Sequence, residues 1–300
     1  MSYDLYLKPR NDEIGAEDVL SFLSESNLYD VHRGQAFYEN EDTGVYFFFE
    51  RNEPLDEEFD EDEDGEEEEF STDDYSVAFN VNLLRPSYFA LEAEKELSRV
   101  VSRFDLSVLD PQTNGIEGNE YDPDRFIQGW NSSNRFGVRS ILSMDDDRPE
   151  VYSMPRAKLE FAWRWNYGRK ELQDKLGESI FVPQIMFFLI KGDPVTAVVW
   201  SDAIPMAFPE AAYIAVYRDE YAPRRWFRGR ESSVEFVPWA DIEGLVRSVT
   251  EEEGEALLAR FEEPPNKVDS FFRSLKSTGI SAERVDPALV IDEELFDLES

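Results

Sequence analysis

Apolar and polar residues alternate with recognisable periods through the first hundred positions of the chain. Side chains of a strand point to opposite faces with a period of two, so the alternation at Tyr3, Leu5 and Leu7 predicts a first strand. Residues 16–24 gather their apolar side chains on one face of a helix. The same reasoning predicts further strands over residues 29–38, 45–50, 75–84 and 106–109, and a second helix over residues 88–103.

This order of elements, β-α-β-β-β-α-β, predicts an α+β fold. It is typical of an antiparallel sheet with two helices, close to a ferredoxin-like split βαβ arrangement with one added strand. Ser87 has a side chain suited to the N-cap of the second helix. Residues 111–124 are rich in turn-forming residues and predict a boundary between a first domain, residues 1–112, and a second domain, residues 113–300.

The second domain is predicted to be another α+β unit, with a small antiparallel sheet and helices toward its C-terminal end. The turn sequence Lys191-Gly192-Asp193-Pro194 joins two apolar runs and predicts a hairpin. The acidic residues from Ile291 onward are expected to fray. Strands are predicted over residues 181–190, 196–201, 212–217 and 234–237, and helices over residues 125–134, 156–176, 238–249, 251–262 and 268–277.

An acidic insert interrupts the first domain. Residues 53–74 carry fifteen carboxylates and no basic side chain, in a chain whose formal net charge is -36. Because like charges repel and few apolar groups offset the entropy of ordering, the insert is predicted to be an extended, solvated loop between two neighbouring strands. Twelve of its carboxylates are the candidate partner-binding residues: Asp56, Glu57, Glu58, Asp60, Glu61, Asp62, Glu63, Asp64, Glu66, Glu67, Glu68 and Glu69.

The chemistry of the insert restricts its partners. It repels nucleic acid phosphates and an anionic membrane surface, and it attracts cations or a basic protein surface. Asp60, Asp62, Asp64 and Gly65 match the opening of an EF-hand loop, but position twelve is Ser71, where calcium needs a bidentate Glu. We therefore predict no metal site and no cofactor.

Composition narrows the class of protein further. The apolar share of 41% and the aromatic share of 14% predict a folded core. Adaptation of an acidic proteome to salt is an alternative explanation of the net negative charge. The chain has no cysteine, which excludes disulfides, thiolate metal sites and Cys nucleophiles, and its single histidine, His32, excludes multi-His sites. The N-terminus lacks a secretory pattern and no apolar run approaches the ~20 residues of a membrane span, so we expect a cytoplasmic protein.

Two aromatic and basic segments admit other interpretations. Residues 161–170 resemble a stacking platform for single-stranded nucleic acid, but the negative charge of the chain favours an ordinary amphipathic helix. The cluster Arg224–Arg230, which contains Trp226, is an alternative binding face, a cis partner of the insert or a solvated loop.

Nucleophile-elbow, P-loop and dinucleotide-binding signatures are missing, which favours a non-enzymatic protein. An enzyme of unrecognised type, with a site between the two domains, is the alternative. Acid–base chemistry by paired carboxylates is open in principle, but the sequence selects no pair among 66 acidic residues.

Several segments carry a resemblance to known proteins. SYDLYLKPR, GQAFYENEDTGVYFFFE, NLLRPSYFALEAEKEL, FVPQIMFFLIKGDPVTAVVW and FVPWADIEGLV look like the corresponding parts of a group of uncharacterised bacterial proteins. Small acidic α+β proteins of this kind resemble immunity proteins that neutralise bacterial toxins, including toxins delivered by contact-dependent secretion. The resemblance carries no catalytic residues. It implies an acidic binding protein of the immunity or inhibitor type that docks on and blocks a basic toxin or another cationic protein.

Overall fold

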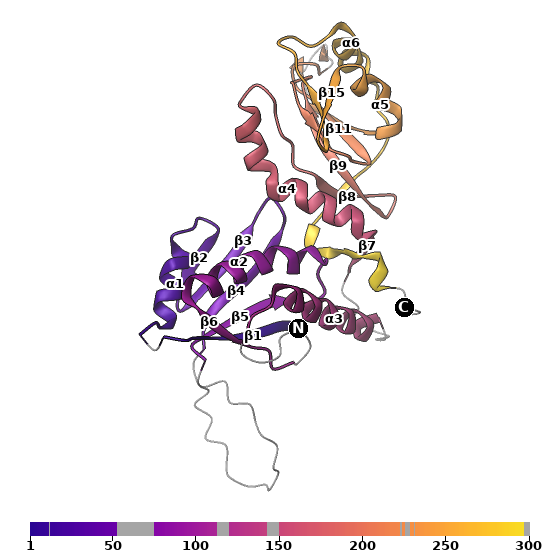
Figure 1. Cartoon of the computed structure of the whole chain (residues 1–300). Helices are drawn as coiled ribbons and strands as arrows, with labels where there is room; N and C mark the ends of the chain where they lie inside the picture. Colours follow the sequence, from indigo (N-terminus) through magenta and orange to yellow (C-terminus); the bar gives the residue numbers. More distant parts are fainter. Residues whose placement is uncertain are drawn as a thin grey trace. The chain divides into compact units, whose positions relative to one another are not determined.

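The computed structural model divides the chain into two compact units, Met1–Glu150 with Ile291–Ser300, and Val151–Val290 (Figure 1). Both units combine helices with sheets, so the predicted α+β class is confirmed. The structure describes residues 1–11, 13–52, 75–112, 120–142, 150–222, 224–225, 229–230 and 232–296.

The first unit is built on a six-stranded antiparallel sheet with the strand order β2-β3-β4-β5-β1-β6. Its helices α1 and α2 contact the strands of this sheet, and α3 packs against α2. The elements are β1 (Ser2–Pro9), α1 (Ala16–Ser24), β2 (Tyr29–His32), β3 (Gln35–Asn40), β4 (Val45–Arg51), β5 (Val77–Asn82), α2 (Tyr88–Phe104), β6 (Leu106–Leu109), α3 (Pro123–Leu142), β18 (Val290–Asp292) and the 3-10 helix η2 (Glu293–Leu295).

Aromatic side chains form the core of the first unit. Every second residue of β4 points inward, so Phe47 and Phe49 are fully buried and pack against Phe79 of β5. Tyr38 of β3 stacks on Phe47 with the ring centroids 4.3 Å apart. Burial of each phenylalanine contributes roughly 1.5–3 kcal/mol relative to an exposed side chain, so this cluster is a major source of stability for the sheet.

The two units divide after Glu150, whereas the turn-rich segment predicted a boundary at residues 112–113. Helix α3 lies in the first unit because its Phe126 ring is buried there, with its centroid 6.0 Å from the rings of both Tyr3 and Phe79. Turn-forming residues therefore mark a connection inside the first unit.

Helix α3 also runs past Asn134, where the predicted helix ended. Asparagine is a poor helix former when its side chain competes for the backbone. Here the Asn134 side chain is 1% exposed and bonds to another segment of the chain instead of its own helix. Its amide oxygen accepts the Leu84 N–H at 2.6 Å, and its amide nitrogen donates to the Arg85 carbonyl at 2.9 Å. The side chain thus fastens α3 to the loop before α2 and leaves the helix free to continue.

The C-terminal segment contributes to the first unit through Asp292. This carboxylate is 2% exposed and accepts hydrogen bonds from the backbone N–H and the hydroxyl of Ser87. Ser87 occupies the predicted N-cap position of α2, but its side chain does not cap the helix and donates to Asp292 instead, so the negative charge of Asp292 lies at the positive end of that helix. The expected fraying from Ile291 is wrong for residues 291–296, because β18 and η2 are ordered there.

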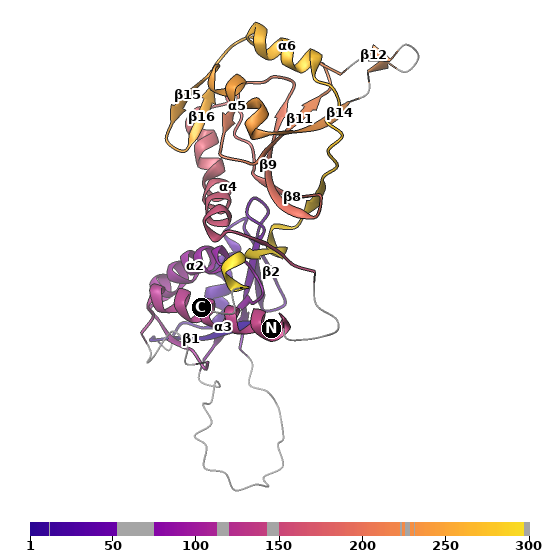
Figure 2. The ribbon, with the colours of Figure 1, turned by 90° about the vertical axis from the view of Figure 1, so that its right-hand side faces the viewer.

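The second unit contains a five-stranded sheet, a three-stranded sheet and three helices among its described residues (Figure 2). Its elements are β7 (Tyr152–Met154), α4 (Arg156–Leu176), β8 (Met186–Ile190), β9 (Asp193–Ser201), β10 (Ala207–Phe208), β11 (Tyr213–Arg218), β12 (Arg224–Arg225), β13 (Gly229–Arg230), β14 (Ser233–Pro238), α5 (Trp239–Arg247), β15 (Thr250–Glu253), β16 (Ala256–Ala259), α6 (Asn266–Ser274), β17 (Glu283–Val285) and the 3-10 helix η1 (Pro287–Leu289).

The larger sheet of the second unit is mixed. Its order is β14-β11-β9-β8-β17, and β9 and β11 run parallel while the other neighbours run antiparallel. A parallel pair needs a crossover connection, which residues 202–212 provide. The small antiparallel sheet predicted from residues 181–190, 196–201, 212–217 and 234–237 corresponds to β8, β9, β11 and β14 of this mixed sheet, and the parallel pair β9–β11 is a correction to that prediction. The three-stranded sheet β10-β16-β15 was not predicted.

Two hairpins replace elements predicted as continuous. Residues 251–262 form the hairpin of β15 and β16 in place of a helix, and Gly254 makes its turn with φ +61. Residues 29–38 form β2 and β3, joined at Arg33 and Gly34, whose φ values are +50 and +81. A positive φ favours glycine, so both turns lie where a glycine interrupts an otherwise regular pattern.

Helix α4 spans Arg156–Leu176 and confirms the predicted range. Its side chains bind the segment that leads into β8. The Trp165 Nε1 donates to the Pro183 carbonyl at 2.7 Å, and the Asn166 amide both donates to the Ile185 carbonyl at 2.9 Å and accepts the Ile185 N–H at 2.8 Å. One side chain therefore satisfies both backbone groups of a buried residue, as a neighbouring strand would.

Candidate partner-binding surface

The acidic insert leaves and re-joins the first unit at one point. All twelve predicted partner-binding carboxylates lie outside the described residues, but both ends of the insert are described. β4 and β5 pair antiparallel up to Arg51 opposite Val77, which confirms that the insert connects neighbouring strands. Beyond that pair, Asn52 donates its backbone N–H to the Ser76 carbonyl at 3.0 Å and its side-chain amide to the Tyr75 carbonyl at 2.8 Å. The ladder thus continues to the last described residue on each side.

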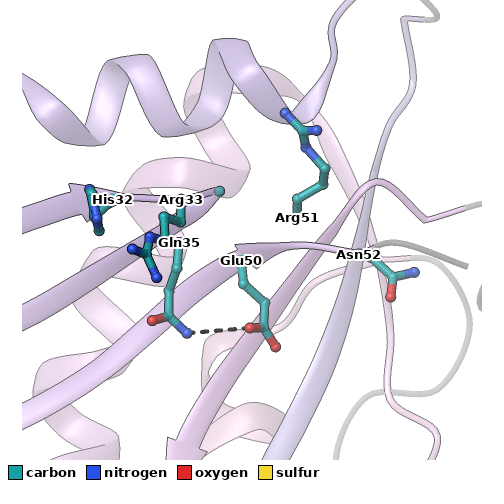
Figure 3. Close-up of a pocket in the computed structure, with 7 residues that line it drawn as sticks. His32, Arg33, Gln35, Glu50, Arg51 and Asn52 are labelled. Atoms are coloured by element: carbon teal, nitrogen blue, oxygen red, sulfur yellow. Dashed lines mark hydrogen bonds between the residues drawn. The ribbon is translucent and has the colours of Figure 1, made fainter. Parts of the chain in front are cut away.

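A cavity of about 780 Å³ lies beside this closure (Figure 3). The β2–β3 turn and the end of β4 provide its lining, which consists of His32, Arg33, Gly34, Gln35, Glu50, Arg51 and Asn52. The alternating pattern of β4 directs Glu50 away from the aromatic core. Glu50 does not stand out in the sequence, because nothing in the pattern separates it from the other 65 acidic residues.

Amide groups hold the Glu50 carboxylate in this cavity. The Gln35 side chain donates to Oε2 at 3.3 Å (Figure 3). The Asn80 side chain donates to Oε1 at 3.2 Å. Arg51 forms an ion pair with Glu17 of α1. The arrangement is a fixed carboxylate with cationic neighbours at the root of the insert, and it can bind polar side chains of a partner.

His32, the single histidine, is the last residue of β2 and is exposed at the cavity lining. A base that acts in catalysis needs an oriented neighbour and a nucleophile within hydrogen-bond reach. The remaining lining of this cavity consists of arginines, amides, a glycine and Glu50, and no hydrogen bond between His32 and Glu50 is among the contacts of the described residues.

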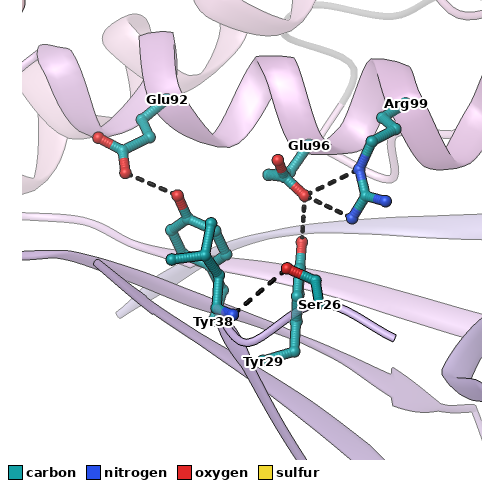
Figure 4. Close-up of polar contacts among 7 residues, drawn as sticks. Ser26, Tyr29, Tyr38, Glu92, Glu96 and Arg99 are labelled. Carbon is teal, nitrogen blue, oxygen red and sulfur yellow. Dashed lines mark hydrogen bonds and ion pairs between the residues drawn. The ribbon is translucent and has the colours of Figure 1, made fainter. Parts of the chain in front are cut away.

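A buried polar network holds α2 on the β2–β3 hairpin (Figure 4). Tyr38 donates its hydroxyl to Glu92 at 2.8 Å, and Tyr29 donates to Glu96 at 2.9 Å, where Arg99 also donates. Burial, and then the nearby Glu96 charge, raise the pKa of Tyr29 far above its ordinary value. Glu92 is fully buried, so these carboxylates of α2 serve the packing of the first unit and not a docking surface.

Charge is distributed unequally between the two units. The first unit contains 44 acidic and 12 basic residues, and the second contains 22 acidic and 18 basic residues. Only fifteen of the 44 belong to the insert. The acidity is therefore a property of the whole first unit, of which the insert supplies a large share.

The two aromatic and basic segments lie in the second unit. In α4, Trp163 and Trp165 are buried, which favours the amphipathic helix over a stacking platform for nucleic acid. Arg224–Arg225 and Gly229–Arg230 pair as the short strands β12 and β13, while Trp226 lies outside the described residues. The described part of the chain holds no group of three or more His, Asp or Glu side chains placed to bind a metal ion.

Within the portions that the structure describes, no helix has both the length and the apolar composition needed to cross a membrane. The chain matches no protein-family model, no curated protein and no solved structure.

Proposed function

We propose that this protein is a non-enzymatic binding protein of the immunity or inhibitor type, which docks its acidic first unit on a basic protein such as a secreted toxin. The observation that carries the proposal is the unequal charge of the units, with 44 acidic against 12 basic residues in the first. A field of this sign attracts cationic surfaces and repels nucleic acid. In keeping with this role, we place the protein in the cytoplasm.

The position of the insert supports the same proposal. Asn52 joins its two ends at the end of the paired strands β4 and β5, so fifteen carboxylates are tethered to one point of a rigid sheet. Toxins that cleave nucleic acid have cationic clefts that bind phosphates. A dense carboxylate segment can occupy such a cleft, and complementary charge accelerates association by roughly 10- to 1,000-fold.

The first unit also supports a more specific fold assignment, an extended ferredoxin-like arrangement. Its strands β6-β1-β5-β4 are antiparallel neighbours, α1 follows β1, and α2 connects β5 to β6. In this assignment, β2 and β3 are a hairpin added between α1 and β4 at the edge of the sheet, one strand more than the sequence predicted.

The test of the function is the kinetics of binding to a cationic partner co-purified from the native host at low salt. We expect the association rate to fall steeply as salt is added, because the Debye length shortens from about 10 Å at 0.1 M to about 3 Å at 1 M. Replacement of residues 56–69 by a short Gly-Ser linker should slow association. The control is Glu262→Gln with Glu263→Gln, which removes two exposed carboxylates of the second unit and should leave the rate unchanged. A partner that associates at the same rate at all salt concentrations would contradict the proposal.

A further inference from the structure

The second unit contains a cavity of about 960 Å³ that the proposed function does not use. The first turns of α4, the start of α5 and the β15–β16 hairpin contribute to its lining. Phe161 and Trp239 are partly exposed in it, and small side chains, among them Ala157, Ala212 and Ala240, leave room beside them. Its volume lies within the range of roughly 300–1,000 Å³ that is common for small-molecule sites, and aromatic linings are typical of such sites.

The cationic side chains of this cavity differ in their pairing. Arg164 lies 3.6 Å from Glu255, and Arg247 lies 2.9 Å from Glu252, so the β15–β16 hairpin neutralises both arginines. Lys158 is exposed and forms no ion pair with any residue that the structure describes. Its ammonium group is therefore available to an anion.

Helix dipoles and one hydroxyl donor add to this positive character. Ala157 and Lys158 belong to the first turn of α4, and Trp239 and Ala240 begin α5, so two helix N-termini contribute to one cavity. The Lys158 N–H donates to the Pro155 carbonyl and the Trp239 N–H to the Ala212 carbonyl, each at 2.9 Å, so these helix ends contribute their dipoles and not free N–H groups. Thr196 is buried at the lining, and since its Oγ1 accepts the Ala212 N–H at 3.2 Å, its proton can be donated to a ligand.

We infer that this cavity binds a small organic anion with a planar apolar body, such as an aromatic carboxylate. The carboxylate pairs with Lys158 and the ring packs against Phe161 and Trp239. The balanced charge of the second unit permits this, whereas the first unit would repel the same ligand. Glu210 is an exposed carboxylate of the same lining. Its negative charge repels the ligand, and this repulsion orients the ligand's carboxylate toward Lys158.

The test uses the full chain and two isosteric probes, indole-3-acetate and its neutral amide, with binding measured by calorimetry and ligand-observed NMR. We expect the carboxylate to bind roughly 2- to 5-fold more tightly than the amide, the range of an exposed ion pair. Lys158→Met should abolish this preference, and Glu210→Gln should strengthen binding of the carboxylate only. The control Lys276→Met removes an exposed lysine that does not line the cavity and should change neither affinity.

A second variant separates the cavity from other surfaces of the protein. Ala240 is exposed in the first turn of α5, so Ala240→Phe can fill the cavity without disturbing the core, and it should weaken both probes. Circular dichroism verifies that each variant is folded. The inference is overturned if neither probe binds the wild type at about 5 mM, a concentration that reveals even weak sites. It is also overturned if Ala240→Phe leaves both affinities unchanged, or if Lys158→Met and Lys276→Met have the same effect.

Discussion

Asp292 accepts two hydrogen bonds from Ser87, a residue 205 positions earlier in the chain. Its Oδ2 lies 2.7 Å from the backbone nitrogen of Ser87, and its Oδ1 lies 2.6 Å from the hydroxyl. Because Ser87 is the N-cap of α2, the carboxylate also lies at the positive end of the helix dipole. A residue 205 positions later in the chain thus fixes the start of α2, a helix that contacts the strands of the first sheet.

Asp292→Ala should therefore destabilise the first unit by about 2–3 kcal/mol, since hydrogen bonds to a charged acceptor are stronger than neutral ones and Ser87 would lose both. Glu293→Ala, which removes the exposed neighbouring carboxylate, is the control and should change the free energy of unfolding by less than about 0.5 kcal/mol. Urea unfolding measures both. Equal effects of the two variants would show that the Ser87 contact is unimportant.

Asn166→Ala should destabilise the second unit by roughly 2 kcal/mol, because both backbone groups of buried Ile185 would lose their partner. Glu171→Ala on the exposed side of α4 is the matched control and should be nearly neutral. Hydrogen exchange of the Ile185 amide provides a local measurement, since its protection should fall in the first variant only. Unchanged protection would mean that other contacts hold this segment.

Stability should decrease at alkaline pH because of buried tyrosines. Burial and then Glu96 raise the pKa of Tyr29, and burial and then Asp110 raise the pKa of Tyr3, above the ordinary value of 10.0. A raised pKa in the folded state gives a contribution that is complete below pH 10 and is lost above it, as tyrosine ionises in the unfolded chain. Each tyrosine then costs about 1.4 kcal/mol per pH unit.

Urea unfolding at about pH 8 and about pH 11 measures this loss, since only the higher value lies above the pKa of an unperturbed tyrosine. Tyr29→Phe should reduce the pH dependence, while Tyr217→Phe, which changes a partly exposed ring, serves as the control. Tyrosinate absorbance should show a fraction that ionises only on unfolding. Identical pH dependence in wild type and Tyr29→Phe would contradict the assignment.

Replacement of residues 56–69 by a short Gly-Ser linker should leave the first unit folded. The contacts of Asn52 with Tyr75 and Ser76 lie outside the replaced segment, and they close the sheet without it. Shortening a loop by half favours closure by about 0.6 kcal/mol, and removal of like charges acts in the same direction. Thermal unfolding should remain cooperative with an unchanged or raised midpoint. Asn52→Ala in the same background should lower stability by about 1 kcal/mol. Loss of cooperativity in the linker variant itself would show that the insert is structural.

The sequence predicted elements whose pattern is local. Helix α4 has its predicted bounds, and buried Leu159, Ala162 and Trp163 follow the helix spacing in its first half. The hairpin β15–β16 was predicted as a helix, because Ala256, Leu257 and Leu258 fit a helix as well as a strand. Their conformation is decided by pairing with β10, which is distant in sequence, and by the turn at Gly254.

Only the acidic character of the candidate surface and its place in the chain could be predicted from the sequence. The density of carboxylates identified the insert and its place between β4 and β5, since charge runs and strand patterns are visible in a linear sequence. Glu50 could not be selected, because its role depends on amides of Gln35 and Asn80, which reach it from two other strands. The distribution of charge between units also required the fold, since residues 291–300 belong to the first unit.

The bond between Ser87 and Asp292 has a consequence for biosynthesis. At roughly 5–20 residues per second, a ribosome needs about 10–40 s to make the stretch that separates the two residues. In the first part of that interval the ribosome makes residues 88–150 of the first unit, and in the rest it makes the second unit, so the first unit lacks residues 291–300 until the second unit has been made. A chain released prematurely within the second unit would never acquire Asp292, so translation to the end is a condition for a fully assembled first unit. The acidic surface of the first unit would therefore reach its final form only after Asp292 has been added to the chain.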